Sequence, residues 1–296
     1  PTWKNEKFAL QWYSSLSNHV LPKIGNIPVS QITSSDILGV LSPIWNTRSD
    51  TARKLKQRIR LVIKWARAKG YFHGDDPVEL AEQALPKKKR SDNHHKSLPF
   101  QDIPNLIIKI RQSNISLPTK LAIQFTIHSA CRTSEVIKAS WNEIDMKTLI
   151  WTIPASRMKT DKIHEVPISS GMLDILKVAK EKIASPDFIF SSNQSGKELS
   201  NNTLRLAVQK RLGIDTTIHG MRSSFKDWAS ETTNFANEVS EMALAHVIPN
   251  KTEAAYRRGN LMDKRRHLMQ MWSDYINDNQ NNVVHPFPQK GDMHGR

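Results

Sequence analysis

The chain has 296 residues, of which 38% are hydrophobic, so it can bury the cores of two domains of ordinary size. It has no run of about 18 uncharged apolar residues, no signal peptide at its start and a single cysteine, Cys131, so we expect a soluble intracellular protein without internal disulfides. A formal net charge of +15 favours a nucleic-acid partner, because basic proteins bind nucleic acids by releasing condensed counterions. A basic membrane-surface protein is the competing interpretation, but no amphipathic apolar face or lipidation signal supports it.

The first 84 residues have the pattern of several short helices, and we expect a small helical DNA-binding bundle there. Its most informative segment is TARKLKQRIRLVIKWARAKG, residues 51–70, where apolar residues repeat at helical spacing between Asp50 and Gly70, two suitable capping residues. The alternative is an ordinary solvated helix, but the segment contains no acidic residue to form the usual i,i+4 ion pairs. We therefore predict contacts to DNA phosphates from six cations: Arg53, Lys54, Lys56, Arg58, Arg60 and Lys64.

Residues 85–98, LPKKKRSDNHHKSL, have the composition of an exposed linker between two domains. We predict that the run of cations within it follows the DNA backbone. A nuclear localisation signal has the same composition, and the run itself does not distinguish the two. The four cations are Lys87, Lys88, Lys89 and Arg90.

From residue 99 the pattern changes to longer, mixed elements. An apolar helix is expected across residues 119–130, then strands at 149–154 and 165–169 joined by a basic loop, and a further short strand at 188–190. Helices resume after Asn201 and continue to about residue 278. The expected fold is mainly α with a small antiparallel β-sheet, arranged as an N-terminal helical domain (1–84) and a C-terminal α+β domain (99–278). Residues 279–296 are expected to form a flexible tail.

Four segments of the second domain contain residues suited to phosphate chemistry: ACRTSEV (130–136), MKTDKIHEVPIS (158–169), HGMRSSF (219–225) and LAHVIPNKTEAAYRR (244–258). Together with the basic helix they occur in the order typical of the tyrosine recombinases. The chain most closely resembles the integrases of phages and genomic islands related to satellite phage P4, over about residues 1–278. The resemblance implies that the two domains are a helical core-binding domain and a catalytic tyrosine recombinase domain.

The resemblance assigns the chemistry to six polar residues: Arg132, Lys159, His219, Arg222, His246 and Tyr256. The two arginines would hold the scissile phosphate, the lysine would protonate the leaving 5′ oxygen, the histidines would assist and the tyrosine would attack. The residue chemistry agrees, because attack adds negative charge to the phosphate oxygens and guanidinium groups present parallel donors that are always charged. Glu135, one helical turn after Arg132, is suited to orient that arginine, although a surface ion pair fits the spacing as well.

Some of these assignments depend on the resemblance more than on the pattern. Lys159 shares its loop with Arg157 and Lys162, and a plain turn lysine is the alternative for it. Two residues depart from the family, because Ala130 and Ala245 stand where it usually has glycine. If either site requires a positive φ, alanine will strain the geometry there. Cys131, beside Arg132, is expected to be a small packing residue.

The mechanism implied by the resemblance forms a 3′-phosphotyrosyl bond to Tyr256 and releases a 5′ hydroxyl, which a partner strand later replaces to integrate or excise a mobile element. It needs neither ATP nor a metal, and the sequence contains no GxxxxGK[ST] or HExxH motif. We therefore expect no cofactor. Two alternatives share the resemblance: DNA relaxation of the type IB topoisomerase kind, and a catalytically silent DNA-binding regulator on the same fold.

The resemblance also implies partners. These are double-stranded DNA attachment sites, three further copies of the chain in a tetramer on two duplexes, and accessory proteins that bend DNA or set the direction of the reaction; no membrane is involved. The location implied is the cytoplasm of a bacterial or phage-infected cell, at the nucleoid. Family members exchange C-terminal segments between neighbours, so residues 260–296 are expected to contribute to assembly. A further domain that binds arm-type DNA sites would precede Pro1.

Overall fold

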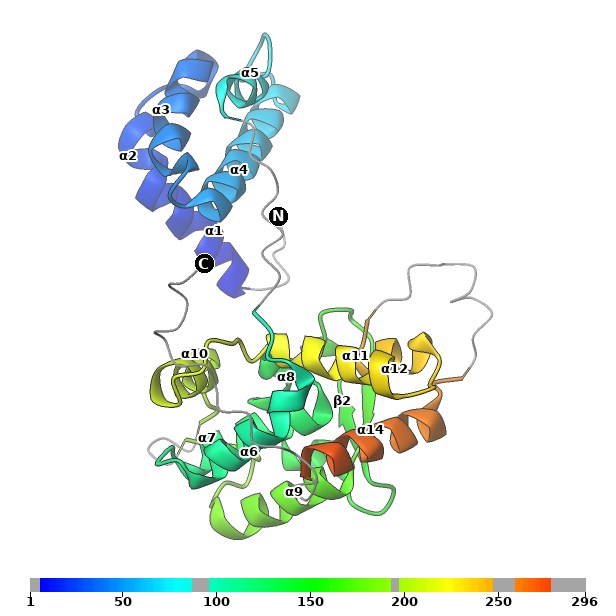
Figure 1. Cartoon of the computed structure of the whole chain (residues 1–296). Coiled ribbons are helices and arrows are strands. Elements are labelled where there is room, and N and C mark those ends of the chain that lie inside the picture. The colour runs from blue at the N-terminus through cyan, green and yellow to red at the C-terminus, as the bar shows by residue number, and fades with distance from the viewer. Residues whose placement is uncertain (1–5, 87–95, 193–196, 247–258, 278–296) are drawn as a thin grey trace, which may run out of the picture. The chain divides into compact units, whose positions relative to one another are not determined.

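The computed structural model describes residues 6–86, 96–192, 197–246 and 259–277 (Figure 1). The chain forms two compact units that divide between Asp92 and Asn93, and each is described by itself below. The basic run from Lys87 to Arg90 and the C-terminal tail lie outside the described residues. None of the described helices is both long enough and apolar enough to cross a membrane.

Unit 1 is a bundle of short helices: α1 Glu6–His19, α2 Leu21–Ile24, α3 Ser34–Trp45, α4 Ser49–Ala68 and α5 Pro77–Ala84. Local side chains fix where two of them begin. Thr33 and Asp36 form a capping box at the start of α3, and Asp76 accepts a hydrogen bond from the backbone at the start of α5. The core is made of buried apolar side chains from α3, α4 and α5: Ile37, Leu41, Leu55, Ile63 and Val78.

Unit 2 is mainly helical, with a small sheet. Its described helices are α6 Ile103–Gln112, α7 Leu117–Ser129, α8 Thr133–Val136, α9 Ser170–Lys182, α10 Asn201–Leu206, α11 Gly220–Thr232, α12 Asn237–Ala243 and α14 Met262–Asn277. The central one is α7, the apolar helix expected at 119–130, which packs against α6, α9, α10, α11 and α14 (Figure 1). Its residues are buried on nearly every side, and this explains why no polar face is visible in its sequence.

The sheet of unit 2 has three antiparallel strands in the order β1 (Ile144–Asp145), β2 (Ile150–Ile153), β3 (His164–Pro167). The alternation of β2 turns Trp151 and Ile153 into the core, where both are fully buried. The strands expected at 149–154 and 165–169 are thus present, and β1 was not foreseen. The strand expected at 188–190 was wrong: Phe188 makes only an isolated bridge to Ser140, and the apolar residues after it are buried by the core rather than by a sheet.

Helix α14 packs into the core of unit 2. Trp272 is fully buried, its indole donates to the carbonyl oxygen of Ile127 at 2.9 Å, and its ring lies 4.9 Å from that of Trp228. One face of α14 is thus used within unit 2, and the expectation that residues 260–296 contribute to assembly stays a prediction. The residues after Asn277 lie outside the described part of the chain.

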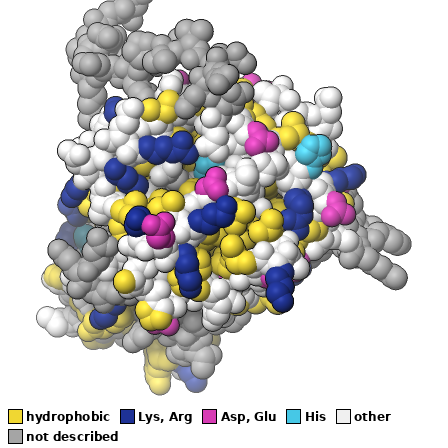
Figure 2. Space-filling view, turned by 90° about the horizontal axis from the view of Figure 1, so that it is seen from below, with side chains coloured by type: hydrophobic (Ala, Val, Ile, Leu, Met, Phe, Trp, Pro, Cys, Tyr) yellow, Lys and Arg dark blue, Asp and Glu magenta, His cyan; other side chains and the backbone are white. Residues whose placement is uncertain are grey.

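Figure 2 views unit 2 from the side on which α9 lies, where hydrophobic side chains form a band between Lys and Arg side chains. Two hollows border α9. One of about 490 Å³ is lined by Leu173 and His267 among others, and one of about 470 Å³ by Trp141 and Leu176. None of the predicted catalytic residues lines either hollow, so these do not identify the site.

Candidate active site

Arg132 lies where the chain turns out of α7 into α8. The turn is made by Ala130, whose φ of 50° is left-handed. The backbone N–H of Arg132 donates to one carboxylate oxygen of Glu135 at 2.7 Å, and its Nη1 donates to the other at 2.8 Å. Glu135 is only 2% exposed, so the pair is not the surface ion pair that the sequence left open. These charge-assisted hydrogen bonds fix the arginine at both its backbone and its head group.

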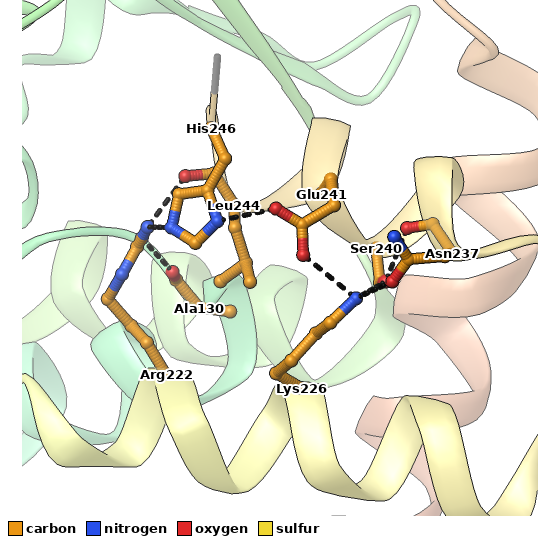
Figure 3. A network of polar contacts seen from close by, with 8 residues as sticks. All are labelled: Ala130, Arg222, Lys226, Asn237, Ser240, Glu241, Leu244 and His246. Atoms are coloured by element: carbon orange, nitrogen blue, oxygen red, sulfur yellow. Dashed lines mark hydrogen bonds and ion pairs between the residues drawn. The ribbon is translucent and has the colours of Figure 1, made fainter. Parts of the chain in front are cut away.

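Arg222 is buried on α11 and held by backbone carbonyl groups. Its Nη1 donates to the oxygen of Ala130, and its Nη2 donates to the oxygen of Leu244 at 2.6 Å (Figure 3). Burial lowers the pKa of Arg222, and the nearby charge of Arg132 lowers it further, yet a guanidinium remains protonated at neutral pH. Because its bonded oxygens are neutral, the positive charge of Arg222 is left to attract an anion.

His246 follows α12 and completes this group. Its Nε2 lies 3.3 Å from Nη2 of Arg222, and its Nδ1 lies 2.8 Å from a carboxylate oxygen of Glu241 (Figure 3). The α7–α8 turn, α11 and the end of α12 therefore meet at one guanidinium, although they are distant in the sequence. Three residues predicted from the resemblance, Arg132, Arg222 and His246, are brought together here.

Both alanines that depart from the family pattern adopt the left-handed conformation, with φ of 50° at Ala130 and 49° at Ala245. The geometry is kept rather than lost, at a cost of roughly 1–2 kcal/mol for each non-glycine residue. Both turns lie beside a backbone carbonyl group that accepts a hydrogen bond from Arg222. The first directs the carbonyl of Ala130 to Arg222, and the second follows directly on the carbonyl of Leu244.

The three other residues predicted from the resemblance are Lys159, His219 and Tyr256. Lys159 is exposed in the β2–β3 loop. The neighbouring Arg157 pairs with Glu143 and donates to the backbone oxygen of Glu135, so it supports α8 and does not face solvent. His219 is an exposed residue immediately before α11. Tyr256 lies outside the described residues.

Gly220, inside the HGMR segment, has a steric role that the sequence did not reveal. A Cβ atom there would lie 2.2 Å from the backbone oxygen of Lys96. The first residues of unit 2 cross the start of α11 at this point, and the backbone N–H of Thr217 donates to the same Lys96 oxygen at 3.1 Å. Only glycine permits this approach, which fixes the end of α11 that carries Arg222.

The inner cations of α4 in unit 1 are engaged within that unit. Arg58 is 7% exposed and donates to the backbone oxygen of Gln11 and to a side chain of α1, and both Lys56 and Arg60 pair with Glu82 of α5. DNA contact for these three cations stays a prediction, and it would require these bonds within unit 1 to break. Helix α4 itself has one acid, Asp50 in its first turn, and the carboxylate that pairs with Lys56 and Arg60 comes from α5, which the sequence of α4 does not indicate.

The outer cations of α4 differ. Arg53 pairs with Asp50 at the exposed start of the helix, while Lys54 and Lys64 are exposed. For these three residues, DNA contact stays a prediction.

Two buried residues near the site were missed by the sequence reasoning. His164 on β3 is 8% exposed, and burial, together with the charge of Arg265, lowers its pKa to about 4. Arg265 on α14 donates to the backbone oxygens of Glu165 and Asn260, which attaches α14 to β3. The alternation of β3, which turns His164 inward like Val166, was the available signal. Burial raises the pKa of the Cys131 thiol to about 12, in keeping with a packing residue.

Both units resemble known proteins. The model of the phage integrase central domain matches residues 1–83, and that of the phage integrase family matches residues 96–261. The chain belongs to the phage integrase family. It is 31% identical over 275 residues to prophage integrase IntA of Escherichia coli K12 and 25% identical over 288 residues to the integrase of Enterobacteria phage P4. These alignments cover 92% and 91% of this chain, but only 65% of the full length of each relative.

Solved structures share the fold. A lambda integrase (75–356) dimer bound to a COC′ core site matches with a TM-score of 0.64 at 16% identity, covering 87% of this chain and 90% of that one. A lambda integrase tetramer bound to a Holliday junction matches with a TM-score of 0.66 at 16% identity, covering 86% and 73%. The predicted fold class and the resemblance to the tyrosine recombinases are thus confirmed.

Proposed function

We propose that this chain is a site-specific DNA recombinase that cleaves and rejoins DNA strands through a covalent bond to Tyr256. The observation that carries the proposal is the convergence of Arg132, Arg222 and His246 from three separate segments on one point. Two guanidinium groups and an imidazole suit a phosphodiester, whose oxygens gain negative charge during attack.

In the proposed reaction the Tyr256 phenol oxygen attacks phosphorus and gives up its proton, and a 3′-phosphotyrosyl bond forms. The bond from phosphorus to the 5′ oxygen breaks, and Lys159 supplies the proton that the leaving oxygen needs. Arg132 and Arg222 stabilise the charge on the non-bridging oxygens. A 5′ hydroxyl of a partner strand then reverses the step, so the energy of the broken bond is kept and no cofactor is consumed.

A nicked duplex carrying the junction sequence of the element that encodes this chain tests the proposal. Cleavage next to the nick releases a short strand that diffuses away, so the covalent complex accumulates and survives denaturant. We expect Tyr256→Phe to abolish this complex and to retain DNA binding, while Tyr71→Phe, at an exposed tyrosine of unit 1, leaves it unchanged. An equal covalent yield from Tyr256→Phe would contradict the assignment of the nucleophile.

The same preparation distinguishes recombination from DNA relaxation. A recombinase requires its junction sequence, so we expect no relaxation of a supercoiled plasmid that lacks it. Relaxation of any plasmid by the protein alone would instead favour the topoisomerase alternative.

We further propose that the chain works on double-stranded attachment sites as a tetramer, at the bacterial nucleoid where such DNA lies, with accessory proteins that bend DNA or set direction. The tetrameric lambda integrase on a Holliday junction supports this assembly by analogy. Mass measurement of the protein mixed with two attachment-site duplexes tests it. We expect four chains on two duplexes, and a complex that remains at one chain per duplex would contradict the proposal.

A further inference from the structure

Glu241 lies between a lysine and the site histidine. On one side, Nζ of Lys226 is 2.9 Å from one of its carboxylate oxygens; on the other, Nδ1 of His246 is 2.8 Å from the second (Figure 3). Lys226 is itself held, because it donates to the hydroxyl of Ser240 at 2.7 Å and to the side chain of Asn237. The lysine projects from α11 and the carboxylate from α12, so the contact also joins these two helices.

The contacts of His246 select one arrangement of its protons. An ionised carboxylate only accepts hydrogen bonds, so Nδ1 of His246 must carry a hydrogen toward Glu241. A guanidinium only donates, so in the neutral ring Nε2 must present its lone pair to Nη2 of Arg222. Both neighbours therefore favour the same tautomer. When the ring is protonated, the added proton is on Nε2, the nitrogen on the Arg222 side.

Glu241 is kept ionised in this position. Burial opposes its charge, but the hydrogen bonds from Lys226 and His246 outweigh that effect and hold the pKa of Glu241 below its ordinary value. It is therefore an acceptor throughout the neutral range. Of the charged groups that contact the His246 ring in the described structure, Glu241 lies on the Nδ1 side and Arg222 on the Nε2 side.

We propose that Glu241 is a positioning residue which, oriented by Lys226, holds His246 with Nδ1 protonated and Nε2 facing the phosphate site beside Arg222. This rests on the proposed recombinase function and adds two residues to the six implied by the resemblance. In this arrangement His246 gains or loses a proton only at Nε2, so it can donate to a phosphate oxygen that replaces Nη2 of Arg222 as its partner, with no change at Nδ1. The role is analogous to that of a carboxylate that fixes the tautomer of a histidine ligand.

Lys226 gives the proposal a specific consequence for Glu241→Gln. The ammonium group only donates, so it will draw the amide oxygen of the new glutamine to itself and leave the amide NH₂ facing His246. The ring must then accept at Nδ1 and carry its hydrogen on Nε2, where it opposes an N–H of Arg222. Removal of the lysine with Lys226→Met frees the amide to turn, and its oxygen can again accept from Nδ1.

Single-turnover cleavage of the nicked duplex, measured beside DNA affinity, tests this with four variants. We expect Glu241→Gln to slow cleavage about 10- to 100-fold, as loss of such outer partners does, with affinity unchanged. Lys226→Met alone should slow it less, and the double variant Glu241→Gln/Lys226→Met should cleave faster than Glu241→Gln. Glu231→Gln, the same substitution at an exposed position of α11, is the matched control and should behave as the unaltered chain. A merely structural carboxylate predicts the opposite for the double variant, which would then be the slowest of the four.

The tautomer can also be observed directly, without DNA. Long-range ¹⁵N–¹H spectra of the full chain labelled in histidine, with His246 assigned from a His246→Gln sample, should show Nδ1–H in the unaltered protein and Nε2–H in Glu241→Gln. The same tautomer in both proteins would overturn the inference. If the tautomers differ as expected but the unaltered protein forms no covalent complex, the recombinase proposal fails and the positioning role of Glu241 stands.

Discussion

Helix α4 of unit 1 and the surroundings of Arg222 in unit 2 are both rich in cations, but the groups bonded to these cations differ. In α4, Lys56 and Arg60 share the carboxylate of Glu82 on the neighbouring helix, and Arg60 also lies 3.7 Å from a carboxylate oxygen of Asp76. Arg222 is held by neutral carbonyl oxygens, so its position is fixed while its charge stays uncompensated by a direct acidic partner within the described residues. The number of cations in a segment therefore does not measure the charge available to DNA. Their bonded partners do.

The largest expected effect of this difference is at Arg222. The substitution Arg222→Lys keeps the charge, but a single ammonium group cannot bond both carbonyl oxygens and still present donors to the phosphate. We expect single-turnover cleavage to fall by about 10²- to 10³-fold, the usual result of losing one such donor. DNA affinity, measured on the same duplex, should change much less, because the contact matters most in the transition state.

The same substitution at exposed Arg211 is the control and should leave cleavage unchanged. Equal cleavage rates for Arg222→Lys and Arg211→Lys would show that Arg222 does not bind the phosphate. The proposed difference between the cations of α4 and Arg222 would then be wrong.

Mild acid should destabilise unit 2 more than unit 1. Burial lowers the pKa of His128 to about 3 and that of His164 to about 4, from 6.5 for both; unit 1, in its described part, has only His19 and His73, neither of them buried. A histidine kept neutral by folding binds more protons when unfolded, so its contribution to stability is complete above pH 6.5 and is lost as the pH falls toward the folded-state value. A shift from 6.5 to about 4 corresponds to about 3 kcal/mol.

Hydrogen exchange, corrected for the intrinsic effect of pH, measures this in each unit. Between pH 6.5 and 5 we expect protection to fall in α7 and β3 and to hold in α3 and α4, because the lowered carboxylate pKa of Glu82 in unit 1 delays its loss to more acidic pH. His164→Gln should reduce the loss in unit 2. Equal loss of protection in the two units would show that the buried histidines do not control it.

A smaller effect is expected at Arg58. Its guanidinium ties α4 to α1 through the backbone oxygen of Gln11 and the side chain of Ser15, and it is nearly inaccessible to solvent. We expect Arg58→Met, which keeps most of the length, to lower the free energy of unfolding of unit 1 by about 1–3 kcal/mol. Urea unfolding followed by the exchange of unit 1 amides is the measurement. An unchanged stability would mean that Arg58 is available to DNA after all.

Patterns within short windows were enough to predict much of the fold. Strand-like patterns indicated β2 and β3, and the apolar content of residues 119–130 indicated α7, because such patterns depend only on how much of the element is buried. The partners of Lys56 and Arg60 could not be predicted in this way. Glu82 is 26 and 22 residues away from them, and nothing in α4 specifies which side of it α5 will cover.

The residues of the candidate site were likewise only partly predictable from the sequence. Arg132, Arg222 and His246 were identified from their order in the chain, which a family resemblance preserves. Glu241 and Lys226 were missed because their role is visible only where α11 and α12 pack together. The packing of α14 into its own unit was not foreseen for a related reason, since an apolar stripe has the same sequence whether it covers its own core or that of a neighbour.

The left-handed alanines allow the strain around Arg222 to be measured. Glycine adopts a positive φ without the Cβ clash, so Ala130→Gly or Ala245→Gly should stabilise unit 2 by about 1 kcal/mol, the cost of that clash less the greater entropy of glycine in the unfolded chain. Thermal unfolding is the measurement. The same substitution at Ala84, an exposed residue in the last turn of α5, should destabilise unit 1 instead. A loss of stability from both site variants would argue against the left-handed turns.

The smallest effect concerns the outer face of α4. It tests whether the exposed cations of that helix contact DNA. Lys64 is exposed, so Lys64→Gln should leave stability unchanged but lower by about 1 the slope of the logarithm of DNA affinity against the logarithm of salt concentration, as loss of one phosphate contact does. Lys54→Gln should act alike, while Arg58→Met, whose cation is bonded inside the unit, should leave the slope unaltered. If Lys64→Gln and Lys54→Gln also leave it unaltered, the cations of α4 that remain exposed do not meet DNA, and unit 1 must bind it through another surface.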